Sequence, residues 1–441
     1  MKKILLQFVF FIMAFNAAGQ AQFQVPDGVD KVEIPFETAY NLIVVPAIVN
    51  GVELKMILDT GASGSIIFNF ANIDSLSMQT GNLLKLSGYG ENTFFSAYYS
   101  QNNIIDINGY KNESANIFVA SEKEVFLEPI LGLPINGLLG ADFFRDAIVK
   151  IDYINQLITV YPDNQKIRRK TRSMSQIPLV FQDGKPYIYS KIYNNNNFLE
   201  TKLLIDTGSG DALWLNDIER EFEVNNKNFE DHLGVGLNGD IYGRRSKLKQ
   251  LVINKFTLDK VTVSLPENKM RSTKEKKETN AGSIGGEILR RFNVVLDYKN
   301  YMLYLEPNKE LSDGFFYNMA GLKIMAGKKE LFTDIVYNSN NKANVYGQEV
   351  EASPNLYASK TFNYKMVPEL IVKYVRPNSP AALAGVMEGD EIIKIDSKEK
   401  GSLTVGDLIS RFHKKPFSSI KLKVKRGDKT LKFKFQLIPL I

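Results

Sequence analysis

The stretch Met56-Ile57-Leu58-Asp59-Thr60-Gly61-Ala62-Ser63 decides how this chain folds. Its three apolar residues lead the carboxyl group of Asp59 into a tight glycine turn, where the charge would be partly buried. A buried charge is costly unless it is paired or hydrogen-bonded. The stretch is therefore the first candidate for a functional site.

The same pattern returns later as Leu203-Leu204-Ile205-Asp206-Thr207-Gly208-Ser209-Gly210. Each copy is followed by a glycine-rich segment, Gly137–Arg145 in the first and Gly282–Arg290 in the second. Asp59 and Asp206 are 147 positions apart, and the two glycine-rich segments begin 145 positions apart. The chain therefore repeats one unit of small-domain size.

These residues resemble the aspartic peptidases, pepsin-like and retropepsin-like alike. That family carries Asp-Thr-Gly in each of two lobes, and a later apolar-apolar-Gly segment braces each loop. Here the bracing segments are Leu138-Leu139-Gly140 and Ser283-Ile284-Gly285, with Ser283 standing where an apolar residue is typical. The resemblance covers roughly residues 30 to 308. It implies a mainly β fold with two homologous retropepsin-like β-barrel lobes, at 30–162 and 177–308, in one bilobal chain.

The resemblance also implies the site: Asp59 and Asp206 would be the catalytic pair, with peptides or unfolded proteins as substrates and no metal or other cofactor. Two adjacent carboxyl groups cannot both ionise cheaply, so one would act as general base and the other as general acid. Thr60 and Thr207 would hydrogen-bond to the opposite lobe. The remaining loop residues are Gly61, Ala62, Gly208 and Ser209, and the Ser209 hydroxyl would reach Asp206.

A hairpin over Leu84–Gly90 and Thr93–Tyr99 falls where this family has its flap, which makes Tyr89 the flap candidate. An ordinary surface hairpin is the alternative. Residues 163–176 are polar and basic, which favours a solvated linker, with a processing site as the alternative. Leu233-Gly234-Val235-Gly236 echoes the first flap, and the Lys- and Glu-rich stretch Glu267–Asn280 is expected to form a mobile loop.

A third unit, residues 312–441, resembles a PDZ domain with an α+β fold. The resemblance rests on Ser379-Pro380-Ala381-Ala382-Leu383-Ala384-Gly385 and Gly389-Asp390-Glu391-Ile392. It implies that Gly321 and Leu322 belong to a loop that captures peptide C-termini, with the peptide adding as a strand. A stretch around residues 328–368 departs from the family and is predicted to be a flexible insertion.

The remaining sequence features limit the cellular location and the kinds of chemistry that are possible. Residues 1–21 read as a secretory signal peptide, with an uncleaved anchor as the alternative, so we expect an exported bacterial protein, periplasmic or secreted, without stable membrane insertion. The chain has no cysteine and two histidines, which excludes thiol catalysis and leaves little for a Ser-His-Asp triad. A net charge of +6 does not suggest nucleic-acid binding.

Two alternatives to a peptidase stay open at this stage. Asp59 and Asp206 could be turn-forming acids, since aspartate favours turns. The chain could also be an inactive peptidase-like scaffold whose PDZ unit acts as a peptide-binding adaptor, because a fold does not fix a function.

Overall fold

The computed structural model describes residues 22–68, 76–86, 88, 94–120, 127–162, 165–195, 197–216, 218, 222–224, 227–267, 281–339, 342–345, 348–351 and 358–441. The predicted signal segment and nearly all of the predicted mobile loop at 267–280 lie outside these residues. Within them the chain is mainly β-structure, as predicted.

The first unit, here called lobe 1, is organised on one sheet of eight described strands in the order β2-β3-β4-β9-β5-β8-β7-β6. The Asn50–Gly51 turn between β3 and β4 has positive φ at both residues (47° and 85°), as a tight hairpin turn requires. The strands are β2 (Glu37–Ala39), β3 (Leu42–Val49), β4 (Val52–Leu58), β5 (Ser65–Ile67), β6 (Thr80–Leu86), β7 (Phe95–Ile107), β8 (Tyr110–Ala120) and β9 (Gly137–Leu139). Two short helices accompany them, α1 (Glu128–Leu131) and η1 (Ala141–Phe143).

The second unit, lobe 2, repeats this plan. β15 pairs in parallel with β22, as β4 does with β9, so each Asp-Thr-Gly loop leaves its sheet beside a glycine-rich strand. The described strands are β13 (Val180–Gln182), β14 (Lys185–Tyr193), β15 (Phe198–Ile205), β16 (Leu213–Leu215), β17 (Phe229–Gly236), β18 (Gly239–Lys247), β19 (Gln250–Ile253), β20 (Phe256–Asp259), β21 (Thr262–Pro266) and β22 (Gly282–Ile284), followed by helix α3 (Gly286–Leu289).

A further sheet takes strands from both lobes, in the order β1-β11-β10-β23-β24-β12. β10 of lobe 1 pairs directly with β23 of lobe 2, so backbone hydrogen bonds join the two units. These strands are β1 (Val32–Pro35), β10 (Ile148–Asp152), β11 (Leu157–Tyr161), β12 (Ser175–Pro178), β23 (Phe292–Asp297) and β24 (Met302–Pro307).

The connector of residues 163–176 differs from the expected solvated linker. Its described part contains helix α2 (Gln165–Thr171), and β12 begins before the connector ends. Ile167 of α2 is 1% exposed and packs with Ile148, Tyr161 and Val295. The basic residues of the helix predict a solvent-exposed segment, so the sequence alone does not reveal that Ile167 is buried.

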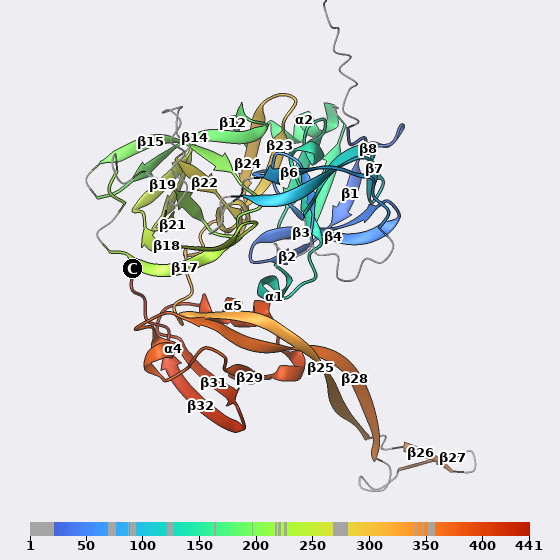
Figure 1. The fold of residues 1–441 in the computed structure, drawn as a ribbon, viewed down its shortest axis with the longest axis vertical. Coiled ribbons are helices and arrows are strands. Elements are labelled where there is room, and N and C mark those ends of the chain that lie inside the picture. Colours follow the sequence, from blue (N-terminus) through green and yellow to red (C-terminus); the bar gives the residue numbers. More distant parts are fainter. Residues whose placement is uncertain are drawn as a thin grey trace, which may run out of the picture.

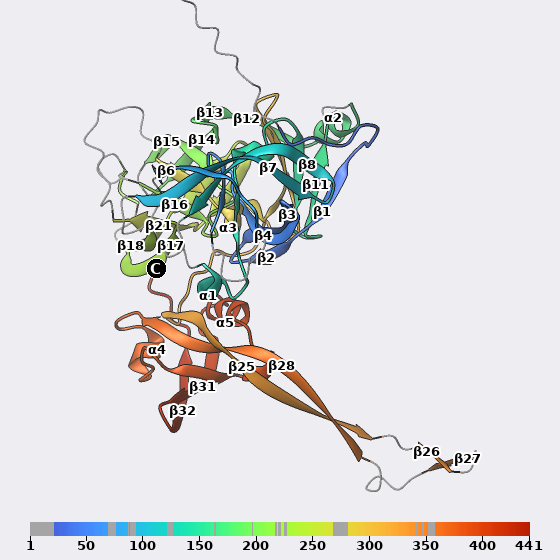
Figure 2. The same cartoon turned by 45° about the vertical axis from the view of Figure 1, so that its right-hand side comes forward.

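The described part of the third unit has one six-stranded sheet and a separate two-stranded sheet of β26 and β27, with helices α4 (Pro380–Leu383), α5 (Val405–Phe412) and η3 (Lys400–Ser402). The stretch predicted as a flexible insertion is, in its described part, an extended arm. There β25 and β28 pair from Leu322–Val375 to Ser339–Ala358, and the arm projects away from the body (Figure 2). The strands are β25 (Leu322–Ser339), β26 (Lys342–Val345), β27 (Gln348–Glu351), β28 (Ala358–Val375), β29 (Glu391–Ile395), β30 (Lys398–Glu399), β31 (Ser419–Arg426) and β32 (Lys429–Gln436).

The two lobes lie side by side, and the third unit lies beneath both (Figure 1). Helix α1 of lobe 1 contacts β25 and α5. Lobe 2 meets the third unit through charges, since Lys373 Nζ donates to Asp240 at 2.9 Å and Arg376 lies 3.6 Å from Asp231. Among the described residues, none of the helices has the length and apolar character needed to cross a membrane.

Candidate active site

Asp59 and Asp206 occupy equivalent places, each one residue beyond the end of its strand. The backbone N–H of Asp59 donates to the carbonyl of Leu139 at 2.9 Å, and that of Asp206 donates to Ile284 at 3.0 Å. The glycine-rich strands therefore hold both loops in the way that the sequence pattern suggests.

The two carboxyl groups meet between Gly61 and Gly208. Gly61 N–H donates to Asp59 Oδ1 at 2.7 Å, and Gly208 N–H donates to Asp206 Oδ1 at 3.0 Å. A Cβ placed on Gly61 would lie 3.0 Å from Asp206 Oδ1 and 3.1 Å from Asp59 Oδ1. A Cβ on Gly208 would lie only 2.2 Å from the carboxyl carbon of Asp59, so a side chain there would collide with the opposite acid.

Thr60 and Thr207 lie beneath the acids and cross-link the two loops. The hydroxyl of Thr60 donates to the carbonyl of Ile205 at 2.6 Å, and the hydroxyl of Thr207 donates to Leu58 at 2.7 Å. Both threonines are buried. Each lobe thus supplies a donor to the strand that carries the other lobe's aspartate.

Both carboxyl groups have raised pKa values. Burial raises the pKa of Asp59, and the N–H of Gly61 and the positive charge of Lys185 act against it. Burial, together with the charge of Asp59, raises the pKa of Asp206 to about 7. Sharing of one proton between two such groups is the known behaviour of the aspartic-protease pair. Burial of two adjacent carboxyl groups therefore favours a state in which the pair holds one proton.

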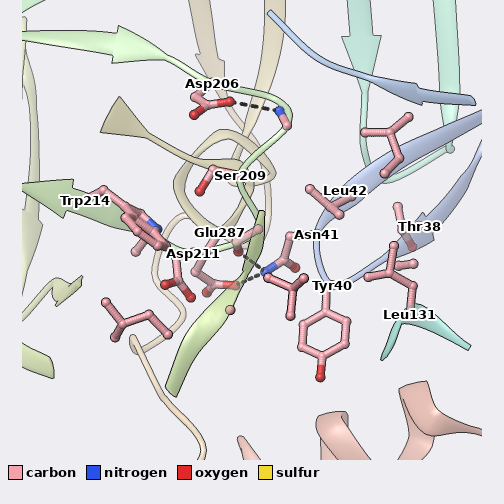
Figure 3. Close-up of a pocket in the computed structure, with 18 of the residues that line it drawn as sticks. Thr38, Tyr40, Asn41, Leu42, Leu131, Asp206, Ser209, Asp211, Trp214 and Glu287 are labelled. Atoms are coloured by element: carbon pink, nitrogen blue, oxygen red, sulfur yellow. Dashed lines mark hydrogen bonds between the residues drawn. The ribbon is translucent and has the colours of Figure 1, made fainter. Parts of the chain in front are cut away.

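The hydroxyl group next to Asp206 comes from a residue other than the expected one. Ser283 on β22 hydrogen-bonds to Asp206 and lowers its pKa, against the larger effect of burial. The sequence assigned such a bond to Ser209, but no hydrogen bond joins Ser209 to Asp206 in Figure 3, where both side chains are drawn. Ala62, at the matching position in lobe 1, accepts through its carbonyl, from Ala141 N–H at 2.9 Å.

Two hairpins approach each other above the pair. Asn238 Nδ2, in the turn between β17 and β18, donates to the carbonyl of Gly88 at 3.0 Å, and Asn238 is 2% exposed. Tyr89, the flap candidate, lies outside the described residues. Gly88 and the described residues 234–237 line the same cavity as Asp59 and Asp206.

A continuous cavity of ≈ 2170 Å³ surrounds the pair and extends to the third unit. Small-molecule sites are typically about 300–1,000 Å³, so this cavity has room for a polypeptide segment. Asn41, at a hairpin tip of lobe 1, reaches into lobe 2 and donates to Glu287 Oε2 at 3.0 Å and to the carbonyl of Gly210 at 2.9 Å (Figure 3).

Gly321 and Leu322 lie where the sequence places them, at the loop that enters β25. Gly321 has φ +78°, and its N–H donates to Asn318 Oδ1 at 3.0 Å. β25 is the edge strand of its sheet in the described part of the chain, and α1 contacts both β25 and α5. The peptide-binding role of this loop stays a prediction.

Sequence reasoning missed Lys185, Asn238 and the bond made by Ser283. The sequence shows Ser283 as a departure from the bracing pattern, but it does not show that the Ser283 side chain points toward Asp206. Lys185 could have been found by aligning the Asp183–Gly184 turn with Tyr40–Asn41, because both turns precede equivalent strands. Asn238 gave no signal, since its partner Gly88 is 150 residues distant.

Comparison with known families agrees with this geometry. Residues 45–143 match the family model described as aspartyl protease, and residues 343–437 match the PDZ domain model. The first match includes Asp59 and ends before Asp206, and the second begins after Gly321. No curated protein matches the chain. The chain contains an aspartyl protease domain and a C-terminal PDZ domain.

Proposed function

We propose that this protein is an aspartic endopeptidase whose two lobes together form one active site. The observation that carries the proposal is the meeting of Asp59 and Asp206 between Gly61 and Gly208, with the two loops cross-linked by Thr60 and Thr207. Turn formation alone would not require two acids from distant parts of the chain to meet in a partly buried place.

In the proposed reaction a water molecule lies between the acids. The Asp59 carboxylate accepts a proton from this water as its oxygen attacks the scissile carbonyl carbon. The protonated Asp206 donates its proton to the carbonyl oxygen, which gives a neutral tetrahedral intermediate. Return of a proton to the amide nitrogen lets the C–N bond break, leaving a carboxylic acid and an amine. No covalent acyl-enzyme forms.

The test is a digest of a mixed peptide library, read by mass spectrometry. We expect cleavage by the wild type and a loss of about 10²–10⁴-fold or more in Asp59→Asn and Asp206→Asn. Asp183→Asn, in an exposed turn of lobe 2, is the matched control and should cleave normally. Circular dichroism checks that each variant is folded. A folded Asp59→Asn enzyme with the wild-type rate would favour the inactive-scaffold alternative.

The PDZ domain is proposed to recruit substrates by their C-termini. A peptide would add to the edge of β25, which pairs with no second strand in the described part of the chain and from which α1 would have to move, with its carboxylate at the loop of Gly321 and Leu322. Because Asn318 already accepts from Gly321 N–H, its side chain must yield to the carboxylate. The full chain should therefore bind a peptide with a free C-terminal carboxylate more tightly than the same peptide with an amidated C-terminus. Equal affinity of the two would rule out carboxylate capture.

The proposed location is outside the cytoplasm, in the periplasm or secreted. It rests on the signal-like residues 1–21. Expression of the full chain followed by fractionation tests the location. Retention of all of the protein in the cytoplasm would contradict it.

A further inference from the structure

Lys185 lies at the edge of the cleft on lobe 2. It begins β14 directly after the Asp183–Gly184 turn and lines the same cavity as Asp59 and Asp206. β14 pairs with β15 so that Tyr187 faces Leu204. Continuing that register by two residues places Lys185 opposite Asp206. The lysine therefore belongs to the wall against which a substrate would lie.

The ammonium group of Lys185 is not held by any described carboxylate of the protein, unlike three other cationic groups that line the cavity. Arg245, Arg290 and Lys373 line the same cavity and form ion pairs with Asp211, Glu287 and Asp240. In the part of the chain that the structure describes, Lys185 forms no such pair. Its charge acts at longer range on Asp59 and Asp206. A half-buried ammonium group without a contact partner favours an anion supplied from outside.

The repeat shows that this charge belongs to one side of the cleft only. Lys185 faces Gln182 across its turn as Leu42 faces Ala39 in lobe 1, so Leu42 is its counterpart. Leu42 is apolar and 8% exposed. The lobe 1 turn is fixed to lobe 2 through Asn41, whereas a Cβ on Gly184 would meet nothing within 4 Å. Lobe 2 therefore presents an open, cationic rim where lobe 1 presents a closed, apolar one.

We propose that Lys185 determines specificity by binding a substrate carboxylate on one side of the scissile bond. The inference rests on the proposed peptidase function. The carboxylate comes either from an aspartate or glutamate side chain or from the C-terminus of a short substrate. Such a group approaching the acids would be repelled by their shared negative charge, and the ammonium group of Lys185 offsets that repulsion. A neutral or basic side chain at this place gains nothing from it.

The experiment uses the full chain and sets of matched peptides with Glu, Gln or Lys at each position near the cleavage site. Each peptide is made with a free and with an amidated C-terminus. At one position we expect Glu to exceed Gln in kcat/KM by roughly tenfold, as one charge-assisted hydrogen bond allows. Lys185→Gln should bring that ratio to about one, and Lys185→Glu should favour the Lys peptide. If the terminal carboxylate is the ligand, free-acid peptides should instead exceed their amides by this factor, and Lys185→Gln should bring that acid-to-amide ratio to about one.

Lys191→Gln is the matched control, because Lys191 lies on the same strand with its ammonium group over the ring of Phe198. It should keep the Glu-to-Gln ratio of the wild type. Removing the charge of Lys185 also changes the electrostatic field at Asp59 and Asp206. Each variant is therefore judged by the ratio of its kcat/KM values for two peptides measured at one pH. An unchanged ratio in Lys185→Gln would overturn the inference and leave the peptidase standing. A wild type that cleaves no peptide would overturn the proposed function, and this inference with it.

Discussion

Thr60 and Thr207 each donate a backbone N–H to the hydroxyl of the other, at 3.1 and 3.0 Å. The donors and acceptors come from opposite lobes and are buried. Loss of one partner leaves buried groups unsatisfied, at a cost of about 1–3 kcal/mol for each. The two lobes therefore depend on this pair for their alignment at the acids.

Thr60→Val should lower the melting temperature and the turnover number together. The change leaves the Thr207 N–H and the Ile205 carbonyl without their partner, and each kcal/mol lost should lower the melting temperature by about 2–4 °C. Thr60→Ser keeps the hydroxyl and should stay close to the wild type. Thermal denaturation and initial rates provide the measurement. Equal melting of the Val and Ser variants would show that the hydroxyl is not what matters.

Ser283→Ala should move the upper limb of the pH–rate profile to higher pH. The hydroxyl stabilises the charged form of Asp206, so its removal raises the pKa at which activity is lost. A shift of about one unit is expected, since a hydrogen bond to a charged group contributes ~1.5 kcal/mol and one pKa unit is about 1.36 kcal/mol. Ser209→Ala should leave the limb in place. The reverse result for the two serines would contradict the assignment.

Asp206→Asn should stabilise the fold at alkaline pH and not at acidic pH. The pKa of Asp206 is about 7 in the folded state, well above the value of about 3.9 in an unfolded chain. The folded state therefore binds more protons between these values, and wild-type stability falls as the pH rises from about 4 to 7. The asparagine variant escapes this loss. Its advantage in melting temperature should be larger at pH 8 than at pH 4.

The matched control for this pH dependence is Asp183→Asn, which changes an exposed aspartate in the same lobe. Its melting temperature should follow that of the wild type at both pH values. An Asp206→Asn advantage that is equal at pH 4 and pH 8 would show that the pKa of Asp206 is not raised in the folded protein.

Specific activity should be independent of enzyme concentration. Both Asp-Thr-Gly loops lie in one chain, and β10 pairs with β23 within it. Retropepsin-like subunits that must dimerise lose specific activity on dilution, but this chain should not. Initial rates over a dilution series provide the measurement. A rate that rises with the square of the concentration would show that two chains are needed.

Much of the site could be predicted because the repeat is visible in the sequence. The apolar approach to Asp59 and Asp206 and the two glycine-rich segments are local patterns, and local patterns predict strands and turns well. The meeting of the two acids required only that the two units face each other. The roles of Thr60 and Thr207 came from family resemblance, and the structure places both hydroxyls at the strand of the opposite lobe.

What could not be predicted depends on side-chain direction and on contacts between distant segments. Ser209 and Ser283 each follow a glycine, Gly208 and Gly282, so the sequence pattern does not distinguish them. The register of β22 against β15 decides which serine hydroxyl reaches Asp206. The Asn and Lys content of the stretch 328–368 predicts flexibility, but the strands β25 and β28 also carry β-branched and aromatic residues and pair with each other. Helix α2 is held by the buried side chains of Ile167 and Thr171, which its run of basic residues does not reveal.

The pairing of β10 with β23 is isologous. Ile148 lies opposite Asp297, and Asp152 lies opposite Asn293, so each edge meets its own repeat counterpart in one register. Such reciprocity is the mark of a two-fold homodimer interface. The chain is thus built like a homodimer whose two subunits are covalently joined. Covalent joining lets each half change alone, which the identical subunits of a homodimer cannot do. Lysine at 185, where the equivalent position in lobe 1 is Leu42, is one such change.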